Sequence, residues 1–310
     1  MKKKLLLVIK IIVSFGLLFY LFNQINFNLL LNKYREINLY LLLIAFVAIL
    51  IQVALSALKW KCILTAERIF IPYKFLLKSY LIGNFLSLFL PTSFGGDIYR
   101  VYSLGNFNLD SFQNASSVLF DRISGLFALV TISILSYATF FKSIISSNIL
   151  LLYIFATLVF WIISSDGIIK ILPRYKFKII GFITKICSSF NKYRKDKSVL
   201  LKSLAISFFF QSNIVLINKL YCVALGIDID IRYLYMVIPI IYLTEAIPIS
   251  INGLGVRDSA FVFFFLRAGY SSEDALALSI LVITIRYIYA STVGGTLFLK
   301  MVFFDKKSEN

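Results

Sequence analysis

Long apolar stretches dominate this chain of 310 residues and restrict what it can fold into. A membrane-spanning helix needs about 20 consecutive apolar residues, because its backbone polar groups must be hydrogen-bonded within the helix. Hydrophobic residues make up 60% of the chain and charged residues only 15%, whereas soluble domains average about 25% charged residues. The sequence therefore predicts an all-α polytopic membrane protein. The predicted full spans are residues 5–22, 39–58, 123–141, 149–164, 203–225 and 275–299.

Two further apolar stretches, 75–104 and 233–267, are each interrupted in the middle by the same short pattern. Residues 91–100 read P-x-S-x-G-G-x-x-x-R, and residues 248–257 read P-x-S-x-N-G-x-x-x-R. Proline removes a backbone donor and clashes with the preceding turn, and the glycines that follow permit a tight reversal. Each stretch is thus predicted to form a helix–break–helix hairpin. The predicted break residues are Pro91, Gly95, Gly96, Pro248, Asn252 and Gly253.

Positive charge indicates how the two interrupted stretches lie in the membrane. The chain carries 32 lysine and arginine residues against 15 aspartate and glutamate residues, a net charge of +17. Cytoplasmic loops carry an excess of lysine and arginine, so the N-terminal lysines and the segment 59–74, with Lys59, are predicted to be cytoplasmic. The basic loop 165–202 falls on the same side only if 75–104 dips into the membrane and returns. By the same reasoning, 233–267 is a second dip that enters from the opposite face.

The predicted fold class is an all-α polytopic membrane protein with about six full spans plus two re-entrant helical hairpins arranged as an inverted repeat. Both termini are predicted to be cytoplasmic, and the protein is expected in the plasma (inner) membrane. Similarly interrupted segments in two halves of a chain point to the substrate site of a transporter built from repeats. The chain is interpreted as a single transmembrane domain, 1–310, with a first half, 1–164, that holds hairpin 75–104, a basic cytoplasmic loop, 165–202, and a second half, 203–310, that holds hairpin 233–267.

The composition excludes several kinds of chemistry. The chain has no histidine, which removes histidine proton relays, histidine metal ligands and nucleophiles that depend on histidine. Its three cysteines have no metal-ligand spacing, so no metal site and no cofactor are predicted. Nucleic-acid binding is the other interpretation of the basic charge, but the positive charges lie between apolar spans, which favours a membrane protein without a nucleic-acid partner.

Charged residues follow each predicted break. Helix N-termini at such breaks carry partial positive charge and unpaired N–H groups, which suit phosphate oxygens. Arg100 and Arg257 come a few residues later, and arginine binds phosphate with a planar fork. Asp97 and Asp258 lie beside them and are expected to pair with the arginines or with a cationic group on a substrate. The alternative is that both breaks are turns between ordinary helices, with arginines at the level of the lipid headgroups.

Other ionisable residues lie within apolar stretches, where a charge costs at least about 2.5–3.5 kcal/mol. Arg286 has two interpretations: a structural ion pair with Glu245, or a headgroup site. Lys219 either has a function or extends to the outer surface, and Asp121 and Arg122 either have a function or form a local pair at the cytoplasmic interface. The full set of candidate substrate-binding residues is Arg100, Arg257, Asp97, Asp258, Glu245, Arg286, Ser93 and Ser250.

Three segments carry a family resemblance: residues 84–100, 121–125 and 245–257. With their order and spacing, the chain resembles the lysylphosphatidylglycerol synthase transmembrane-region family, whose members are also described as flippase-like. In the two-part multiple peptide resistance factor, a region of this type moves aminoacylated phosphatidylglycerol across the membrane, and a separate soluble domain performs aminoacyl transfer. No counterpart of that domain is expected in this chain. The resemblance thus implies lipid translocation without lipid synthesis.

Related transmembrane regions also accompany glycosyltransferases that act on polyprenyl lipids, so the resemblance leaves the cargo open between a phospholipid and a polyprenyl-linked lipid. A separate synthase or glycosyltransferase is the implied protein partner. Two rival hypotheses remain. One is a membrane enzyme of lipid modification, such as a phosphatidylglycerol lysyltransferase, although the sequence shows no nucleotide- or tRNA-binding motif. The other is a non-transporting subunit that recruits a synthase through the basic loop.

Overall fold

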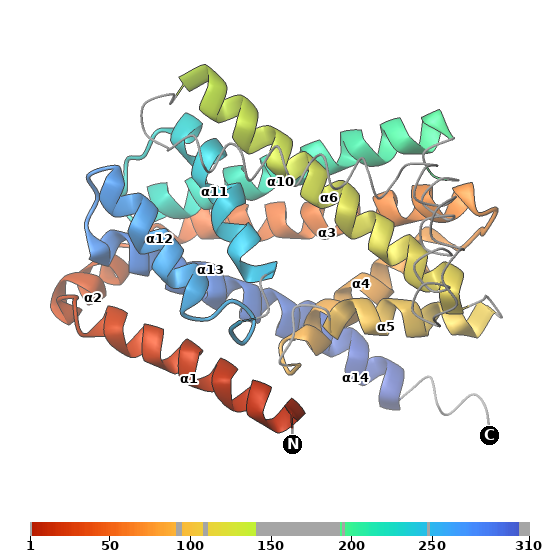
Figure 1. Cartoon of the computed structure of the whole chain (residues 1–310), viewed down its shortest axis with the longest axis horizontal. Helices are drawn as coiled ribbons and strands as arrows, with labels where there is room; N and C mark the ends of the chain where they lie inside the picture. Colours follow the sequence, from red (N-terminus) through yellow and green to blue (C-terminus); the bar gives the residue numbers. More distant parts are fainter. Residues whose placement is uncertain are drawn as a thin grey trace. The chain divides into compact units, whose positions relative to one another are not determined.

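The computed structural model describes residues 2–90, 95–107, 111–140, 193, 196–246 and 249–303. Within these ranges the regular secondary structure is helical and contains no strand, which confirms the predicted all-α class (Figure 1). Several predictions fall outside the described residues: the break residues Pro91 and Pro248, the candidate Ser93, the span 149–164 and most of the loop 165–202.

Four helical segments are long and apolar enough to cross a membrane among the described residues. They are α3 (Leu39–Ala66), α6 (Ser111–Phe140), α10 (Lys197–Ala224) and the continuous segment Ser272–Phe303, made of α13 (Ser272–Tyr289), a π-helical turn (Ala290–Gly295) and α14 (Thr296–Phe303). A fifth span is formed if α1 (Lys2–Phe22) and α2 (Phe27–Arg35) act together, although they meet at an 88° bend. The protein is thus a multi-pass membrane protein.

Helix α6 starts at Ser111, before residue 123, where the predicted span 123–141 starts. Its first turns are polar, and Asn114, Ser116 and Ser117 are buried inside the protein. Hydropathy alone missed these turns because it measures the preference of a residue for lipid and not for a protein interior.

The chain divides into two compact units. The first unit comprises residues 1–51, 81–96 and 213–310, and the second comprises residues 52–80 and 97–212. The division passes through α3 and α10. It also passes through the first copy of the repeated pattern, so that Gly96 belongs to the first unit and Asp97 to the second.

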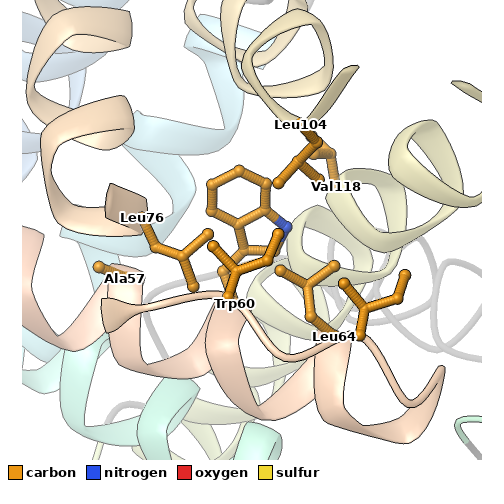
Figure 2. Close-up of a cluster of buried hydrophobic side chains, with 8 residues drawn as sticks. Ala57, Trp60, Leu64, Leu76, Leu104 and Val118 are labelled. Carbon is orange, nitrogen blue, oxygen red and sulfur yellow. The ribbon is translucent and has the colours of Figure 1, made fainter. Parts of the chain in front are cut away.

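The core of the second unit surrounds Trp60 on α3, whose side chain is fully buried (Figure 2). Leu76 of α4 (Tyr73–Ser87), Leu104 of α5 (Gly95–Leu104) and Val118 of α6 belong to the same cluster. The indole N–H of Trp60 donates to Ser117 Oγ at 3.1 Å, which satisfies its one polar atom. This cluster holds α4 and α5 against α3 and α6.

Helices α4 and α5 fold back on each other. The ring of Phe75, near the start of α4, contacts Phe107, beyond the end of α5, edge-on at 4.9 Å between centroids. Nearer the break, Gly83 and Gly96 bring the two backbones together: a Cβ on Gly83 would lie 2.9 Å from the Gly96 carbonyl oxygen, and a Cβ on Gly96 would lie 2.7 Å from that of Gly83. Only glycine allows this approach. The two helices thus form a helical hairpin.

Helices α11 (Ile231–Ala246) and α12 (Val256–Arg267) form a second hairpin within the first unit. At one end, the Tyr233 hydroxyl donates to the Phe264 carbonyl oxygen at 2.7 Å. At the break, Asn252, Gly253 and Gly255 have φ values of 49°, 79° and 79°. These left-handed conformations reverse the chain, and glycine adopts them without strain.

Candidate functional site

The breaks of the two hairpins contact each other within the first unit. The Asn252 amide nitrogen donates to the backbone carbonyl oxygens of Ser87 and Leu90, at 3.2 Å each. Ser87 ends α4, and the last carbonyl groups of a helix have no partner within the helix. Asn252 is also the position where the second copy of the pattern differs from the first, which has Gly95. The second break therefore caps the helix that leads into the first.

Arg100, the arginine of the first copy, is buried within the second unit at 3% exposure. Its two terminal nitrogens pair with Asp97 Oδ1 at 3.1 Å and with Asp121 Oδ2 at 2.8 Å. The guanidinium carbon lies 4.3 Å from the centre of the Trp60 ring and 3.9 Å from that of Tyr80. Ion pairs and aromatic faces thus hold this arginine on several sides.

Asp121 and Asp97, the two carboxylates paired with Arg100, each have further partners. At the inner end, Lys59 Nζ lies 2.8 Å from Asp121 Oδ1 and donates to Ser207 Oγ at 3.2 Å, and the Tyr80 hydroxyl donates to Asp121. At the outer end, Arg122 Nε donates to Asp97 Oδ2 at 2.7 Å. Asp121 and Arg122 therefore form ion pairs with other helices, whereas the sequence had also allowed a merely local pair.

Lys59 itself corrects a prediction. It was placed after the end of the predicted span 39–58, but it lies inside α3, which continues to Ala66, and it is buried. We call Lys59, Tyr80, Asp97, Arg100, Asp121 and Arg122 the α5–α6 network.

Arg257, the arginine of the second copy, is buried in the first unit at 1% exposure. Its terminal nitrogens pair with Glu245 Oε1 at 2.7 Å and with Asp258 Oδ1 at 3.2 Å. The Ser279 hydroxyl donates to Asp258. Arg286 Nη1 reaches both Glu245 oxygens, at 3.1 and 3.3 Å, so the expected Arg286–Glu245 pair is present. We call these five residues the α11–α13 network.

The two networks follow the same order. Each begins with an arginine whose side chain is substantially exposed, 45% for Arg122 and 40% for Arg286. In both, this arginine lies on the long helix after the hairpin, and a carboxylate links it to the buried arginine of the repeated pattern. A buried aspartate and a hydroxyl donor complete the chain. The order is Arg122–Asp97–Arg100–Asp121–Tyr80 in one network and Arg286–Glu245–Arg257–Asp258–Ser279 in the other.

The networks differ in charge. The α5–α6 network has three cations and two carboxylates, because Lys59 joins its inner end. The α11–α13 network has two cations and two carboxylates.

Two further candidates from the sequence, Ser250 and Lys219, are not members of either network. Ser250 is buried, and its hydroxyl has no hydrogen-bond partner among the described residues. Lys219 Nζ donates to the Ile229 carbonyl oxygen at 2.6 Å and lies 3.5 Å from Asp228, so it fastens the turn between α10 and α11. In the described part of the chain, no group of three or more His, Cys, Asp or Glu residues is arranged to hold a metal ion.

Sequence reasoning found the arginines and carboxylates but missed Lys59, Trp60, Tyr80 and Ser279. The signal that identified the arginines and carboxylates was charge within an apolar stretch. Tyrosine, tryptophan and serine are ordinary in membrane helices, so nothing in the sequence distinguished these three residues. Of the charged candidates, one group comes together in the second unit: Asp97, Arg100, Asp121 and Arg122. Another group comes together in the first unit: Glu245, Arg257, Asp258 and Arg286.

These features define a multi-pass helical membrane protein with two broken hairpins, each linked to a buried network of ion pairs. The family model described as "Lysylphosphatidylglycerol synthase TM region" matches residues 7–294, and the chain belongs to this family. This confirms the resemblance inferred from the three motif segments. No curated protein and no solved structure matches the chain.

Proposed function

We propose that this protein is a flippase-like lipid translocase of the plasma membrane. Its cargo is an anionic or aminoacylated phospholipid, or a polyprenyl glycolipid. The observation that carries the proposal is the contact of Asn252 with the end of α4, which joins the breaks of the two hairpins. Broken helices in corresponding positions of two halves form the substrate sites of many secondary transporters.

The break between α11 and α12 is held from several directions, as irregular backbone at membrane depth requires. Besides the Asn252 contacts, Ile251 N–H donates to Ser14 Oγ on α1 at 3.0 Å, and Gly255 N–H donates to Asp258 Oδ2 at 2.8 Å. In the proposal, both hairpins are re-entrant and enter from opposite faces, and both termini are cytoplasmic. The proposed role of the fixed break is to keep the charged residues beside it in position while the lipid headgroup passes.

The networks supply chemistry that matches a phospholipid headgroup. Arginine binds phosphate oxygens through two parallel N–H donors, and ionisable residues within membrane spans commonly mark substrate pathways. Asp97 and Glu245, with side chains 13% and 14% exposed, would meet an ammonium group on an aminoacylated headgroup. Each network by itself therefore offers both signs of charge to a headgroup that carries phosphate with or without an amine.

The test is lipid movement in reconstituted vesicles. The full chain is inserted into phosphatidylcholine vesicles that contain phosphatidylglycerol with a fluorescent acyl chain, and dithionite then bleaches the probe in the outer leaflet. The proposal predicts bleaching beyond the outer-leaflet share, because translocated probe becomes accessible. Bleaching equal to that of protein-free vesicles, with phosphatidylglycerol, lysylphosphatidylglycerol and a polyprenyl glycolipid alike, contradicts it.

The rival function is lipid modification, which the word synthase in the description of the family favours. Its test uses the same purified protein with radiolabelled lysyl-tRNA and phosphatidylglycerol. Formation of labelled lipid above the protein-free level would establish an enzyme. The translocase proposal predicts none.

A further inference from the structure

We propose that the exposed side of α13, the π-helical turn and α14 forms a hydrated path that the lipid headgroup follows, while the acyl tails stay in the hydrocarbon. The inference rests on the proposed function, since it names the surface along which that movement takes place. All of the residues whose packing and exposure carry it belong to the first unit.

The exposed side chains of this segment are mostly polar over its second half. From residue 284 to residue 300 they are Thr284, Tyr287, Ile288, Ser291, Thr292, Thr296, Leu299 and Lys300. At the 1.5 Å rise of a helix, this stretch is about 24 Å long, against about 30 Å for the hydrocarbon core of a bilayer. We call Thr284, Tyr287, Ser291, Thr296 and Lys300 the polar face.

The spacing of these five residues places them on one side of the segment. Residues three or four apart share a helix face, which accounts for the steps up to Ser291 and for the last step, from Thr296 to Lys300. The step from Ser291 to Thr296 is longer and would leave that face in a regular α-helix. It crosses the π-helical turn Ala290–Gly295, whose wider i→i+5 spacing brings Thr296 back. The turn thus keeps the polar face continuous.

The opposite side of the turn packs against α4. A Cβ on Gly295 would lie 3.1 Å from Cε2 of Phe85, and a Cβ on Gly294 would clash with the Leu81 carbonyl oxygen. The ring centroids of Phe85 and Phe298 are 5.6 Å apart. The segment therefore contacts α4 through its glycines, and this contact does not explain why its other side is polar.

The exposed side of α3 shows which residues meet lipid in the same unit. Its exposed side chains include Leu43, Ile44, Val47 and Ile51, which are all aliphatic. Acyl chains offer no hydrogen-bond partner to a hydroxyl group or an ammonium group. If the segment Ser272–Phe303 met only acyl chains, its exposed side would be expected to match that of α3.

Arg286 indicates that water reaches this part of the segment. It precedes Tyr287 of the polar face and lies near the middle of Ser272–Phe303, and 40% of its side chain is exposed although it pairs with Glu245. A charge at the bilayer centre costs at least about 2.5–3.5 kcal/mol, and such residues face the protein interior or a water-filled space. The exposed guanidinium at mid-span therefore favours water beside it.

The polar face suits a headgroup that moves along it. The Thr296 hydroxyl donates to the Thr292 carbonyl oxygen at 2.7 Å, and its oxygen can still accept a further hydrogen bond. A hydroxyl group exchanges hydrogen bonds with water and with a headgroup at little net cost, so it offers contact without holding the lipid. Lys300 adds a positive charge at one end, which attracts anionic headgroups.

A second copy of the chain is the other occupant that a polar helix face could take, because hydroxyl groups can hydrogen-bond between membrane helices. Such a contact would enclose the charges of Arg286 and Lys300 in a dry interface. The cost of burying them favours the hydrated path.

Cysteine accessibility tests the path independently of lipid movement. The three native cysteines of the full-length protein are first replaced by alanine. Single cysteines are then introduced as Thr284→Cys, Ser291→Cys and Thr296→Cys, with Val47→Cys and Ile51→Cys on the exposed side of α3 as controls. In vesicles of phosphatidylcholine and phosphatidylglycerol, a charged methanethiosulfonate is added to both sides. It reacts with thiolates, which form in water, so the three test cysteines should react at least about tenfold faster than the controls.

Two results of this experiment overturn the inference. The first is reaction of the three test cysteines at the rate of the α3 controls, which would place the polar face in lipid or in a dry contact. The second is oxidative cross-linking of Ser291→Cys between two copies in place of labelling, which would assign the face to a protein interface.

Lipid movement tests whether the headgroup uses the face. The triple variant Thr284→Val/Ser291→Ala/Thr296→Val removes three hydroxyl groups with little change in volume, and it should slow the movement of fluorescent phosphatidylglycerol by about tenfold or more. The control is Thr139→Val, which removes an exposed threonine on α6 that donates to its own helix, to the Leu135 carbonyl oxygen at 2.7 Å. The control should move lipid like the parent, and both variants should keep the parent's thermal unfolding midpoint.

The two experiments separate this inference from the proposed function. Parent-like lipid movement in the triple variant, or labelling at the control rate, removes the inference and leaves the translocase in place. An absence of lipid movement in the parent chain removes the translocase and the headgroup path together.

Discussion

The Asn252 side chain donates to the carbonyl oxygens of both Ser87 and Leu90, and so joins two segments that are more than 160 residues apart in the chain. This contact explains why the second copy of the repeated pattern has asparagine where the first has Gly95. An asparagine tolerates the left-handed conformation that the break needs, at φ 49°, and its amide also reaches the Ser87 carbonyl at the end of α4 and the Leu90 carbonyl just beyond it.

Asn252→Gly isolates the two hydrogen bonds, because glycine keeps the left-handed backbone without strain. The loss should lower the free energy of unfolding by about 1–2 kcal/mol and slow lipid translocation. Thermal unfolding in detergent, followed by circular dichroism, measures the first effect. An unchanged midpoint would show that the Asn252 contacts contribute nothing to the fold.

The close approach of α4 and α5 predicts that Gly83→Ala and Gly96→Ala are both harmful. A new Cβ would lie 2.9 or 2.7 Å from a backbone oxygen of the opposite helix, so the helices must separate, at a cost of about 1–3 kcal/mol. Gly16→Ala in α1 is the control, since nothing lies within 4 Å of its added Cβ. Equal unfolding midpoints for the three variants would contradict the hairpin geometry.

Asp121 is the acceptor that balances the inner end of the α5–α6 network. Asp121→Asn leaves Lys59 and Arg100 buried without their shared carboxylate, which should destabilise the protein by about 3–5 kcal/mol. Asp230→Asn removes an exposed carboxylate and should change the unfolding midpoint little. If the two variants unfold alike, the buried network is not a stabilising element.

The anchoring of α2 yields a prediction about local motion. Lys33 Nζ lies 2.7 Å from Asp274 Oδ1, and the Tyr34 hydroxyl donates to the Ala277 carbonyl oxygen at 2.7 Å. Lys33→Glu places like charges together at the start of α13 and should release α2. Hydrogen exchange in α2 should then accelerate while exchange in α12 stays unchanged. Protection of α2 equal to that of the parent would place the anchor elsewhere.

Local signals in the sequence were enough for the helical class, the two breaks and the carboxylates beside them. Proline followed by glycine, and charge within an apolar stretch, act through backbone geometry and desolvation, which need no knowledge of distant residues. The partners of a charged residue cannot be found from such local signals, because they can lie far away in the chain. Lys59 resembled a loop charge because its burial depends on Asp121, which lies 62 residues away.

Repetition directed attention to Arg100 and Arg257, and both are buried and paired with carboxylates. Arg122 and Arg286 differ in their sequence surroundings, and only packing places them at equivalent outer positions. Physical equivalence without sequence similarity cannot be read from a single chain.

The most direct test of the central claim compares lipid translocation by the parent chain with that of the triple variant Thr284→Val/Ser291→Ala/Thr296→Val, with Thr139→Val as control. All three are reconstituted at equal density in phosphatidylcholine vesicles that contain fluorescent phosphatidylglycerol, and dithionite accessibility is recorded. The account predicts rapid probe movement in the parent and the control, and movement slower by about tenfold or more in the triple variant. Parent-like movement in the triple variant, from folded protein, would contradict it.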